Sequence, residues 1–222
     1  MDADATLRDR LAAAWPLFGL EIRSERLSLR LPTDGELLQL MDLVRAGIHP
    51  PDEMPFASPW SVLPSPAFER GYLTYHWTNR SAWSVDAWEL GLAVSLHGTL
   101  VGMQGISARA FPAARTVHTG SWLGMAHQGQ GFGKEMRAAV LAFAFDGLAA
   151  RVAETEAYLD NAASNAVSRA VGYEENGSGT LAPYDTPRET RRFRMTVEQW
   201  RSRPRPAVEI IGLDACRDQF GI

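Results

Sequence analysis

The stretch that decides the fold reads Gln128-Gly129-Gln130-Gly131-Phe132-Gly133-Lys134. It lies between residues 117–123, which are apolar enough for a buried strand, and residues 131–146, whose apolar side chains recur at helical spacing. Glycine lets a backbone approach a ligand closely, and the unpaired amide groups of a first helical turn face such a ligand with the positive end of the helix dipole. The stretch therefore predicts a phosphate-binding turn between a strand and a helix.

Two better-known phosphate-binding loops do not fit these residues. A Walker loop needs glycine where Gln128 stands and serine or threonine where Glu135 stands. A dinucleotide-binding loop needs glycine or alanine where Lys134 stands. For the stretch taken alone, a plain glycine-rich turn without a ligand is the remaining alternative.

The pattern that does fit is Gln or Arg, two residues, Gly, one residue, then Gly or Ala, and it is matched by Gln128, Gly131 and Gly133. In this respect the chain resembles the GNAT superfamily of N-acyltransferases, whose pyrophosphate loop carries the pattern between the fourth strand and the third helix. The resemblance implies that the turn binds the diphosphate of an acyl-CoA.

A second block extends the resemblance. Asn161, Ser164 and Val167, followed by Gly172-Tyr173, resemble the superfamily's Asn-x-x-Ser-x-x-Val and Gly-Phe/Tyr signature, which opens and ends the helix after the fifth strand. The serine variant is typical of the branch that acetylates ribosomal-protein N-termini. Asn161 and Ser164 also suit a helix N-terminus without any ligand, and the two roles are compatible.

The resemblance implies a fold and a set of binding residues. The fold is α/β (α+β), with a central mixed, mostly antiparallel twisted sheet of about seven strands, flanked by helices and splayed between strands four and five. Leu123 would offer its backbone to pantetheine in the splay, and Trp122 either packs in the core or lines the site. The implied cofactor-binding residues are Leu123, Gln128, Gly129, Gly131, Phe132, Gly133, Lys134, Asn161 and Ser164.

Four pieces of the sequence, at 52–56, 120–124, 135–141 and 160–173, resemble an actinobacterial branch that includes a succinyl-CoA transferase. The implied acyl donors are therefore acetyl-CoA and succinyl-CoA. Succinyl-CoA would need a cationic or multiply hydrogen-bonded pocket for its extra carboxylate, and the sequence does not locate one.

The implied reaction is direct attack of a neutral amine on the thioester, with a base for the ammonium proton, backbone amides for the oxyanion and an acid for the thiolate. Many superfamily members place a tyrosine as the acid, and Ser168 stands at that position. His118 is a candidate base because imidazole titrates near neutral pH, although a lone strand histidine is more often a surface or core residue. Asp52 and Glu53 either bind the acceptor amine or are solvated loop carboxylates.

The acceptor stays open between a protein N-terminus, a lysine and an amine on a small metabolite. A competing hypothesis from another class is a non-catalytic GNAT-like module that binds CoA or a metabolite as a sensor. Ser168 at the tyrosine position favours that module, whereas the intact glycine turn and Asn161 favour an enzyme.

Local patterns outside the site predict further elements. The alternation over 26–31 predicts a strand, and Thr33 is expected to cap the helix that follows. Six prolines between residues 49 and 66 predict a long surface loop that serves as a lid or substrate wall. An aromatic-faced helix is predicted over 67–82, and a hairpin turn at His97-Gly98.

The chain has 222 residues, a net charge of −4 and 45% hydrophobic residues, which is typical of a folded globular protein. We expect one domain over 21–203, with an N-terminal extension over 1–20 and a C-terminal tail over 204–222. The acidic balance gives no reason to expect nucleic acid or a membrane as a partner, and the start lacks the pattern of a signal peptide. The histidine spacing indicates no metal site, and the single cysteine, Cys216, is expected to be structural. We further expect a cytoplasmic homo-oligomer.

Overall fold

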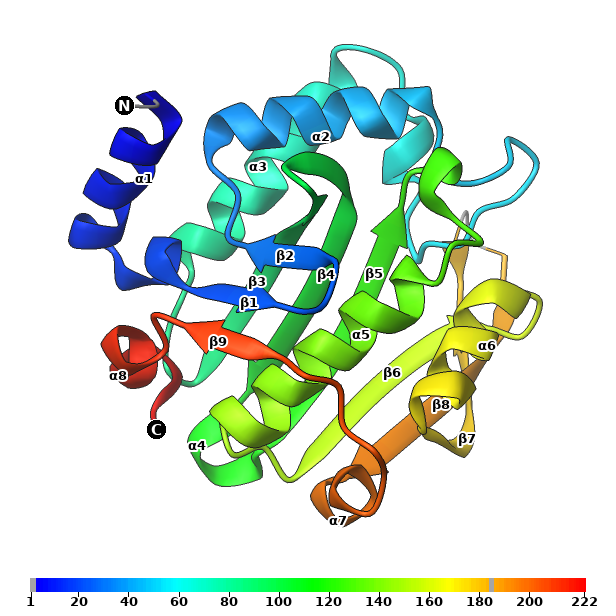
Figure 1. The fold of residues 1–222 in the computed structure, drawn as a ribbon. Helices are drawn as coiled ribbons and strands as arrows, with labels where there is room; N and C mark the ends of the chain where they lie inside the picture. The colour runs from blue at the N-terminus through cyan, green and yellow to red at the C-terminus, as the bar shows by residue number, and fades with distance from the viewer. Residues whose placement is uncertain (1–2, 184–185) are drawn as a thin grey trace.

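The chain forms one twisted sheet of nine strands in the order β7-β8-β6-β5-β4-β3-β2-β1-β9 (Figure 1). The computed structural model describes residues 3–183 and 186–222. β5 and β6 pair in parallel, whereas every other strand pair described is antiparallel. The strands are β1 (Glu21–Arg23), β2 (Leu27–Arg30), β3 (Ala87–Leu96), β4 (Thr99–Arg109), β5 (Thr116–Leu123), β6 (Val152–Tyr158), β7 (Glu174–Leu181), β8 (Arg188–Thr196) and β9 (Glu209–Ile211). This architecture confirms the predicted mixed, mostly antiparallel sheet, with two strands more than expected.

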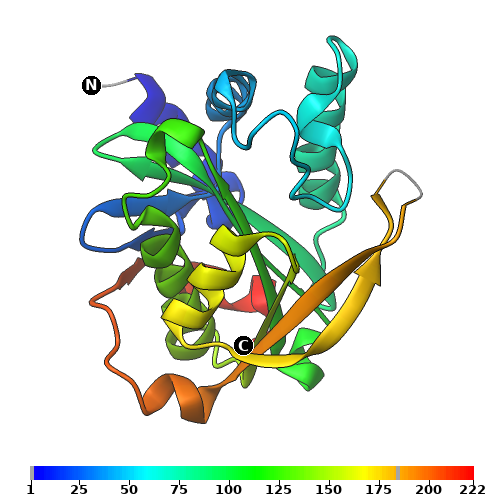
Figure 2. The ribbon, with the colours of Figure 1, turned by 90° about the vertical axis from the view of Figure 1, so that its right-hand side faces the viewer.

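Helices cover both faces of the sheet (Figure 2). One face carries α2 and α3, whose buried side chains pack with residues of β3 and β4, and the other carries α5 and α6. A π-helical turn over Phe143–Gly147 continues α5. The helices are α1 (Ala3–Ala14), α2 (Asp34–Ala46), α3 (Ala67–Ser81), α4 (Phe111–Ala114), α5 (Phe132–Ala142), α6 (Ala162–Val171), α7 (Val197–Arg201) and α8 (Arg217–Phe220).

Local signals place several of these elements where the sequence predicts them. The Thr33 hydroxyl accepts from the Glu36 amide at 3.2 Å, and the Glu36 carboxylate accepts from the Thr33 amide at 2.7 Å, which makes a reciprocal cap for α2. His97 (φ 49°) and Gly98 (φ 86°) form the turn between β3 and β4. These contacts join residues within a few positions of one another, so sequence patterns reveal them.

Segments near both ends of the chain form regular elements outside residues 21–203. Residues 204–222 contribute β9, which pairs with β1, and they bury Cys216 and Phe220 against the core beneath α5. The sequence does not predict α1, because its apolar residues do not recur on one face of the helix. The Arg8 side chain of α1 donates hydrogen bonds to the carbonyl oxygens of Phe18 and Leu31. In the described part of the chain, no helix has the length and apolar character needed to cross a membrane.

Candidate functional site

β5 and β6 separate after a short parallel pairing. Their ladder covers only Thr116–His118 against Val152–Glu154, while β5 continues to Leu123 and β6 to Tyr158. Beyond the ladder, β5 stays paired to β4 and β6 to β8, so the two strands diverge toward their C-terminal ends (Figure 1). Beyond the ladder the backbones of β5 and β6 no longer pair with each other, so the opening between them can admit a ligand. This opening is the splay that the sequence predicts.

The glycine-rich stretch forms the turn at the open end of the splay. Gly129 (φ +73°) and Gly131 (φ +86°) adopt the left-handed backbone region that favours glycine. A Cβ atom at Gly129 would meet nothing within 4 Å, and one at Gly131 would meet only the Arg26 guanidinium, at 3.5 Å. No side chain caps α5, which begins at Phe132. The turn thus presents uncapped helical amides beside open space, an arrangement that fits a phosphate group.

Gln128 braces the turn from inside. Its side-chain amide donates to the carbonyl oxygens of Leu123, at 3.0 Å, and of Ile48, at 2.9 Å. These bonds tie the end of β5 to the segment that follows α2. The side chain of Gln128 is therefore used for shaping the turn, and the amide hydrogens left for a ligand are those of the backbone.

A residue far away in the sequence holds the same turn. Arg26, between β1 and β2, forms an ion pair with Glu135 at 2.6 Å and lies 4.5 Å from the ring centroid of Phe132. Burial raises the pKa of Glu135, but hydrogen bonds from the Arg26 amide, the Ser24 hydroxyl and the Arg26 guanidinium outweigh it and hold the pKa below its ordinary value. Sequence reasoning missed Arg26 because nothing local to it signals this contact.

The start of α6 uses the second predicted block. The Asn161 side chain accepts from the Ser164 amide at 3.0 Å and so caps the helix. Ser168 is fully buried, and its hydroxyl donates to the Ser164 carbonyl oxygen at 3.0 Å. Gly172 ends the helix at φ +103°. Asn161 thus has the capping role expected without a ligand, and Ser168 lies inside the helix packing.

The proline-rich loop is fastened across the open end of the splay. Tyr158, at the end of β6, donates to the Phe56 carbonyl oxygen at 3.4 Å. Arg188 lies 3.9 Å over the Tyr158 ring and donates to the Met54 carbonyl oxygen at 2.7 Å. The loop therefore bridges to β6 and forms one wall of the opening between the strands, and its role as a lid or substrate wall stays a prediction.

Aromatic rings line this wall. Trp122 on β5 lies 6.2 Å from Trp60, which lies 5.0 Å from Phe56, and Phe56 lies 5.7 Å from His49, all measured between ring centroids. Trp122 is partly buried and packs against the core on the α2 and α3 side. The expected packing of Trp122 is therefore confirmed, and its role in lining the site stays a prediction.

His49 and Ser61 form a hydrogen-bonded pair within the loop. His49 Nδ1 lies 2.8 Å from the Pro50 carbonyl oxygen, which only accepts, so Nδ1 carries the proton. In the neutral ring, Nε2 then accepts from the Ser61 hydroxyl at 2.8 Å. Sequence reasoning missed this pair because it weighed His49 as a metal ligand only, and twelve positions separate the two residues.

The two loop carboxylates that remain as candidates, Asp52 and Glu53, lie apart from His118. Asp52 and Glu53 are exposed in the loop. His118 lies in the paired part of β5, with 59% of its side chain exposed and its Nδ1 3.8 Å from a Glu154 carboxylate oxygen. The loop carboxylates thus lie in the segment that bridges to β6, whereas His118 lies at the closed end of the splay.

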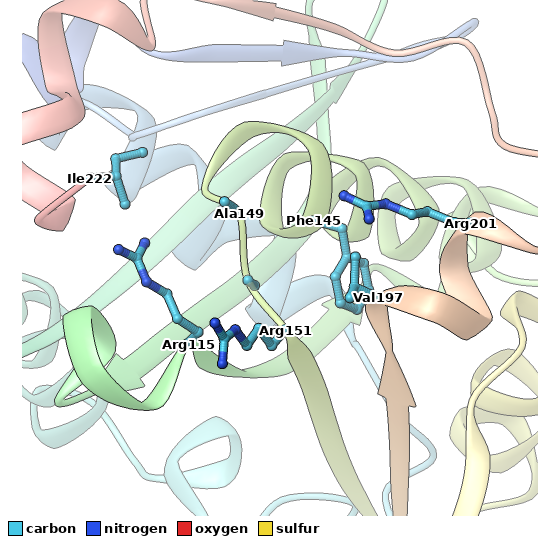
Figure 3. Close-up of a pocket in the computed structure, with 8 residues that line it drawn as sticks. Arg115, Phe145, Ala149, Arg151, Val197, Arg201 and Ile222 are labelled. Carbon is cyan, nitrogen blue, oxygen red and sulfur yellow. The ribbon is translucent and has the colours of Figure 1, made fainter.

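A cavity of about 490 Å³ lies elsewhere in the molecule. Arg115, Arg151 and Arg201 line it together with apolar side chains (Figure 3). Arg115 and Arg151 directly precede β5 and β6, so the cavity borders the N-terminal ends of these strands, whereas the glycine turn follows the C-terminal end of β5. The residues that the sequence predicts for the site are not among those that line this cavity.

Comparison with known proteins agrees with this geometry. Many solved structures are similar to the chain, including the following three. RimJ of Mycobacterium smegmatis, in complex with a CoA disulfide, is 18% identical, with a TM-score of 0.66 and coverage of 89% of this chain and 91% of that one. RimL, a ribosomal-protein alpha-N acetyltransferase in complex with coenzyme A, is 18% identical, with a TM-score of 0.63 and coverage of 79% and 97%. The microcin C7 self-immunity acetyltransferase MccE, in complex with acetyl-CoA and AMP, is 15% identical, with a TM-score of 0.58 and coverage of 78% and 93%.

These likenesses show the fold, and a match at the level of sequence shows the family. Residues 26–174 match the acetyltransferase (GNAT) domain, and they contain the glycine turn, both diverging strands and the Asn161 block. With more than half of its length matched, the chain belongs to the GNAT acetyltransferase family.

Proposed function

We propose that this protein is an acyl-CoA-dependent N-acyltransferase that moves an acetyl or succinyl group to a primary amine by direct attack in a ternary complex. The observation that carries the proposal is the uncapped glycine turn at the open end of the splay. Its left-handed glycines keep side chains away from the first amides of α5, where a diphosphate would bind. Relatives that hold coenzyme A or acetyl-CoA support the same ligand class.

The binding residues follow from this placement. The diphosphate of the donor would lie on the backbone of Gly129 and of residues 131–134, with the positive end of the α5 dipole toward it. Pantetheine would lie along the splay, where Leu123 lends its backbone to it. Asn161 and Ser164 would border the donor from α6, in addition to their capping bond.

The reaction needs a neutral amine, hence a proton acceptor near the loop wall. His49 with Ser61 suits this role best, because the Nε2 lone pair is already oriented toward the Ser61 hydroxyl. An amine proton would pass to the Ser61 oxygen as the Ser61 proton passes to His49 Nε2. His118 remains the alternative base from the sequence.

Two further groups complete the proposed site. Asp52 and Glu53 would attract the ammonium form of the acceptor, whether a protein N-terminus, a lysine or a small-metabolite amine. The Ser168 hydroxyl would donate to the departing sulfur only after it releases the Ser164 carbonyl oxygen. We also propose a cytoplasmic homo-oligomer, which light scattering after size-exclusion chromatography would test.

The buried hydroxyl of Ser168 favours a second candidate function, a CoA-binding sensor without catalysis. A thermal-shift series with CoA, acetyl-CoA, succinyl-CoA and ATP, followed by an amine-acylation assay, separates the candidates. A ligand at 100 times its Kd stabilises the fold by about 2.7 kcal/mol. We expect stabilisation by the CoA compounds, and acylation in addition if the protein is an enzyme. Stabilisation by ATP alone would contradict both candidates.

A further inference from the structure

Arg137 is a buried cation at the apex of the splay. It projects from α5, has 3% of its surface exposed, and donates to the Thr155 hydroxyl at 3.2 Å and to the Ser121 hydroxyl at 3.0 Å. The Tyr173 hydroxyl is a third polar neighbour. All three partners are neutral, and the buried Arg137 Nε has no hydrogen-bond partner among the described residues.

A buried guanidinium without a charged partner destabilises the fold, so stability alone does not explain Arg137. Burial lowers the pKa of Arg137, yet a guanidinium stays protonated in proteins, so the charge persists without a carboxylate beside it. An uncompensated buried charge destabilises a fold, and an apolar side chain of similar volume often does better. The neighbouring buried positions on α5, Met136 and Val140, are apolar. Arg137 is therefore a candidate for binding rather than for packing.

Its position points to the acyl end of the donor. Thr155 on β6 directly follows the last paired residue, Glu154, and Ser121 on β5 lies three positions after the last paired residue, His118. The guanidinium thus spans the gap where the strands begin to diverge. Thr155 is itself fixed, since its hydroxyl donates to the Thr119 carbonyl oxygen at 2.8 Å. A chain that enters the splay from the glycine turn would reach Arg137 with its far end.

We propose that Arg137 binds the terminal carboxylate of the donor's acyl group, so that the preferred donor is a dicarboxylic acyl-CoA of about the length of succinyl-CoA. The inference rests on the proposed function. A carboxylate would accept two hydrogen bonds, from the free Nε–H and from the Nη2 group on the same edge of the guanidinium. An acetyl group would leave this cation unpaired. Because hydrogen bonds to both strands fix the position of the guanidinium, the affinity for the donor should depend on the length of its acyl group.

Calorimetric titration of the wild-type protein tests the proposal. The donors are CoA, acetyl-CoA, butyryl-CoA, malonyl-CoA, succinyl-CoA and glutaryl-CoA. Butyryl-CoA is the matched control, since it has four acyl carbons and lacks the carboxylate. We expect succinyl-CoA to bind about 10- to 100-fold more tightly than butyryl-CoA, as a charge-assisted bidentate pair would. Equal or weaker binding of succinyl-CoA would overturn the inference. Failure of CoA itself to bind would instead overturn the proposed function.

Substitution localises the effect. Arg137→Met keeps much of the volume and removes the charge, so the ratio of succinyl to butyryl affinity should fall to about 1 while the affinity for CoA is retained. Arg137→Lys keeps the charge without the planar fork and should restore part of the ratio. A full wild-type ratio in Arg137→Met would overturn the role of Arg137. If a variant does not fold, the wild-type series still decides the donor class.

Discussion

The Arg26 guanidinium and the Glu135 carboxylate form an ion pair at 2.6 Å that fastens the β1–β2 turn to the first turn of α5. Arg26 also donates from Nε to Glu135 at 2.7 Å, and its guanidinium lies near the ring of Phe132. This pair sets the position of the amides that follow Gly131, so it links a short hairpin near the N-terminus to the proposed donor site.

Removing this brace should weaken donor binding more than folding. Arg26 is partly exposed, so the loss of its ion pair should change the free energy of unfolding by about 1 kcal/mol or less. Arg26→Ala should raise the Kd for CoA about 5- to 20-fold, measured by calorimetry, because the turn loses its fixed shape. Arg23→Ala is the matched control, since Arg23 pairs with Glu21 and Glu209 away from the turn. The same Kd in both variants would contradict the role given to Arg26.

A bulky residue at Gly131 should abolish CoA binding. Gly131→Val places a side chain over the first amides of α5, and its φ of +86° adds backbone strain of roughly 1–2 kcal/mol. Gly98→Val is a close control, because Gly98 has the same φ and open space around it in a hairpin turn. The melting temperature should fall by a similar amount in both variants. Only Gly131→Val should show no binding of CoA in a calorimetric titration. Retained affinity in Gly131→Val would rule out the turn as the diphosphate site.

Comparison of two histidine variants should identify the proton acceptor. His49→Gln removes the imidazole that accepts from Ser61, so we expect kcat to fall roughly 100-fold or more. The Kd for CoA should stay the same. His118→Gln changes an exposed residue in the paired part of β5 and should leave kcat as it is. The opposite pattern would assign the base to His118.

His76 should make the fold sensitive to acid. Burial, and then the nearby Arg80 charge, lowers the pKa of His76 from 6.5 to about 4. Between pH 6.5 and about 4 the His76 imidazole is therefore protonated in the unfolded chain and neutral in the folded chain. The free energy of unfolding falls as the pH falls through this window. The slope from one such group reaches at most about 1.4 kcal/mol per pH unit. Urea unfolding of wild-type and His76→Gln between pH 4 and 7 should show a shallower dependence in the variant, and equal slopes would refute this role.

The sequence predicts the parts of the site that depend on neighbours along the chain. Gly131 and Gly133 predict a tight turn before a helix, and Asn161 predicts an N-terminal helix cap. Both predictions succeed because backbone conformation and capping depend on residues a few positions apart. The same holds for Thr33 and its reciprocal bond with Glu36. The structural roles of such residues can be predicted without knowledge of the fold.

Contacts between segments that are distant in the sequence could not be predicted from local patterns. Arg26 and Glu135 are 109 positions apart, and Arg137 meets its partners Ser121 and Thr155 only because β5 and β6 diverge beneath α5. β9 is three residues long and has no pattern of its own; its pairing with β1 depends on where the rest of the sheet ends. The acyl-recognition residue therefore becomes visible only once the sheet is assembled.

The most direct test is a crystal structure of the protein with CoA. We predict that the diphosphate oxygens lie within hydrogen-bond distance of backbone amides between Gly129 and Lys134, with pantetheine between β5 and β6. A CoA molecule bound elsewhere with this turn empty, or no binding of CoA at all, would contradict the proposed function.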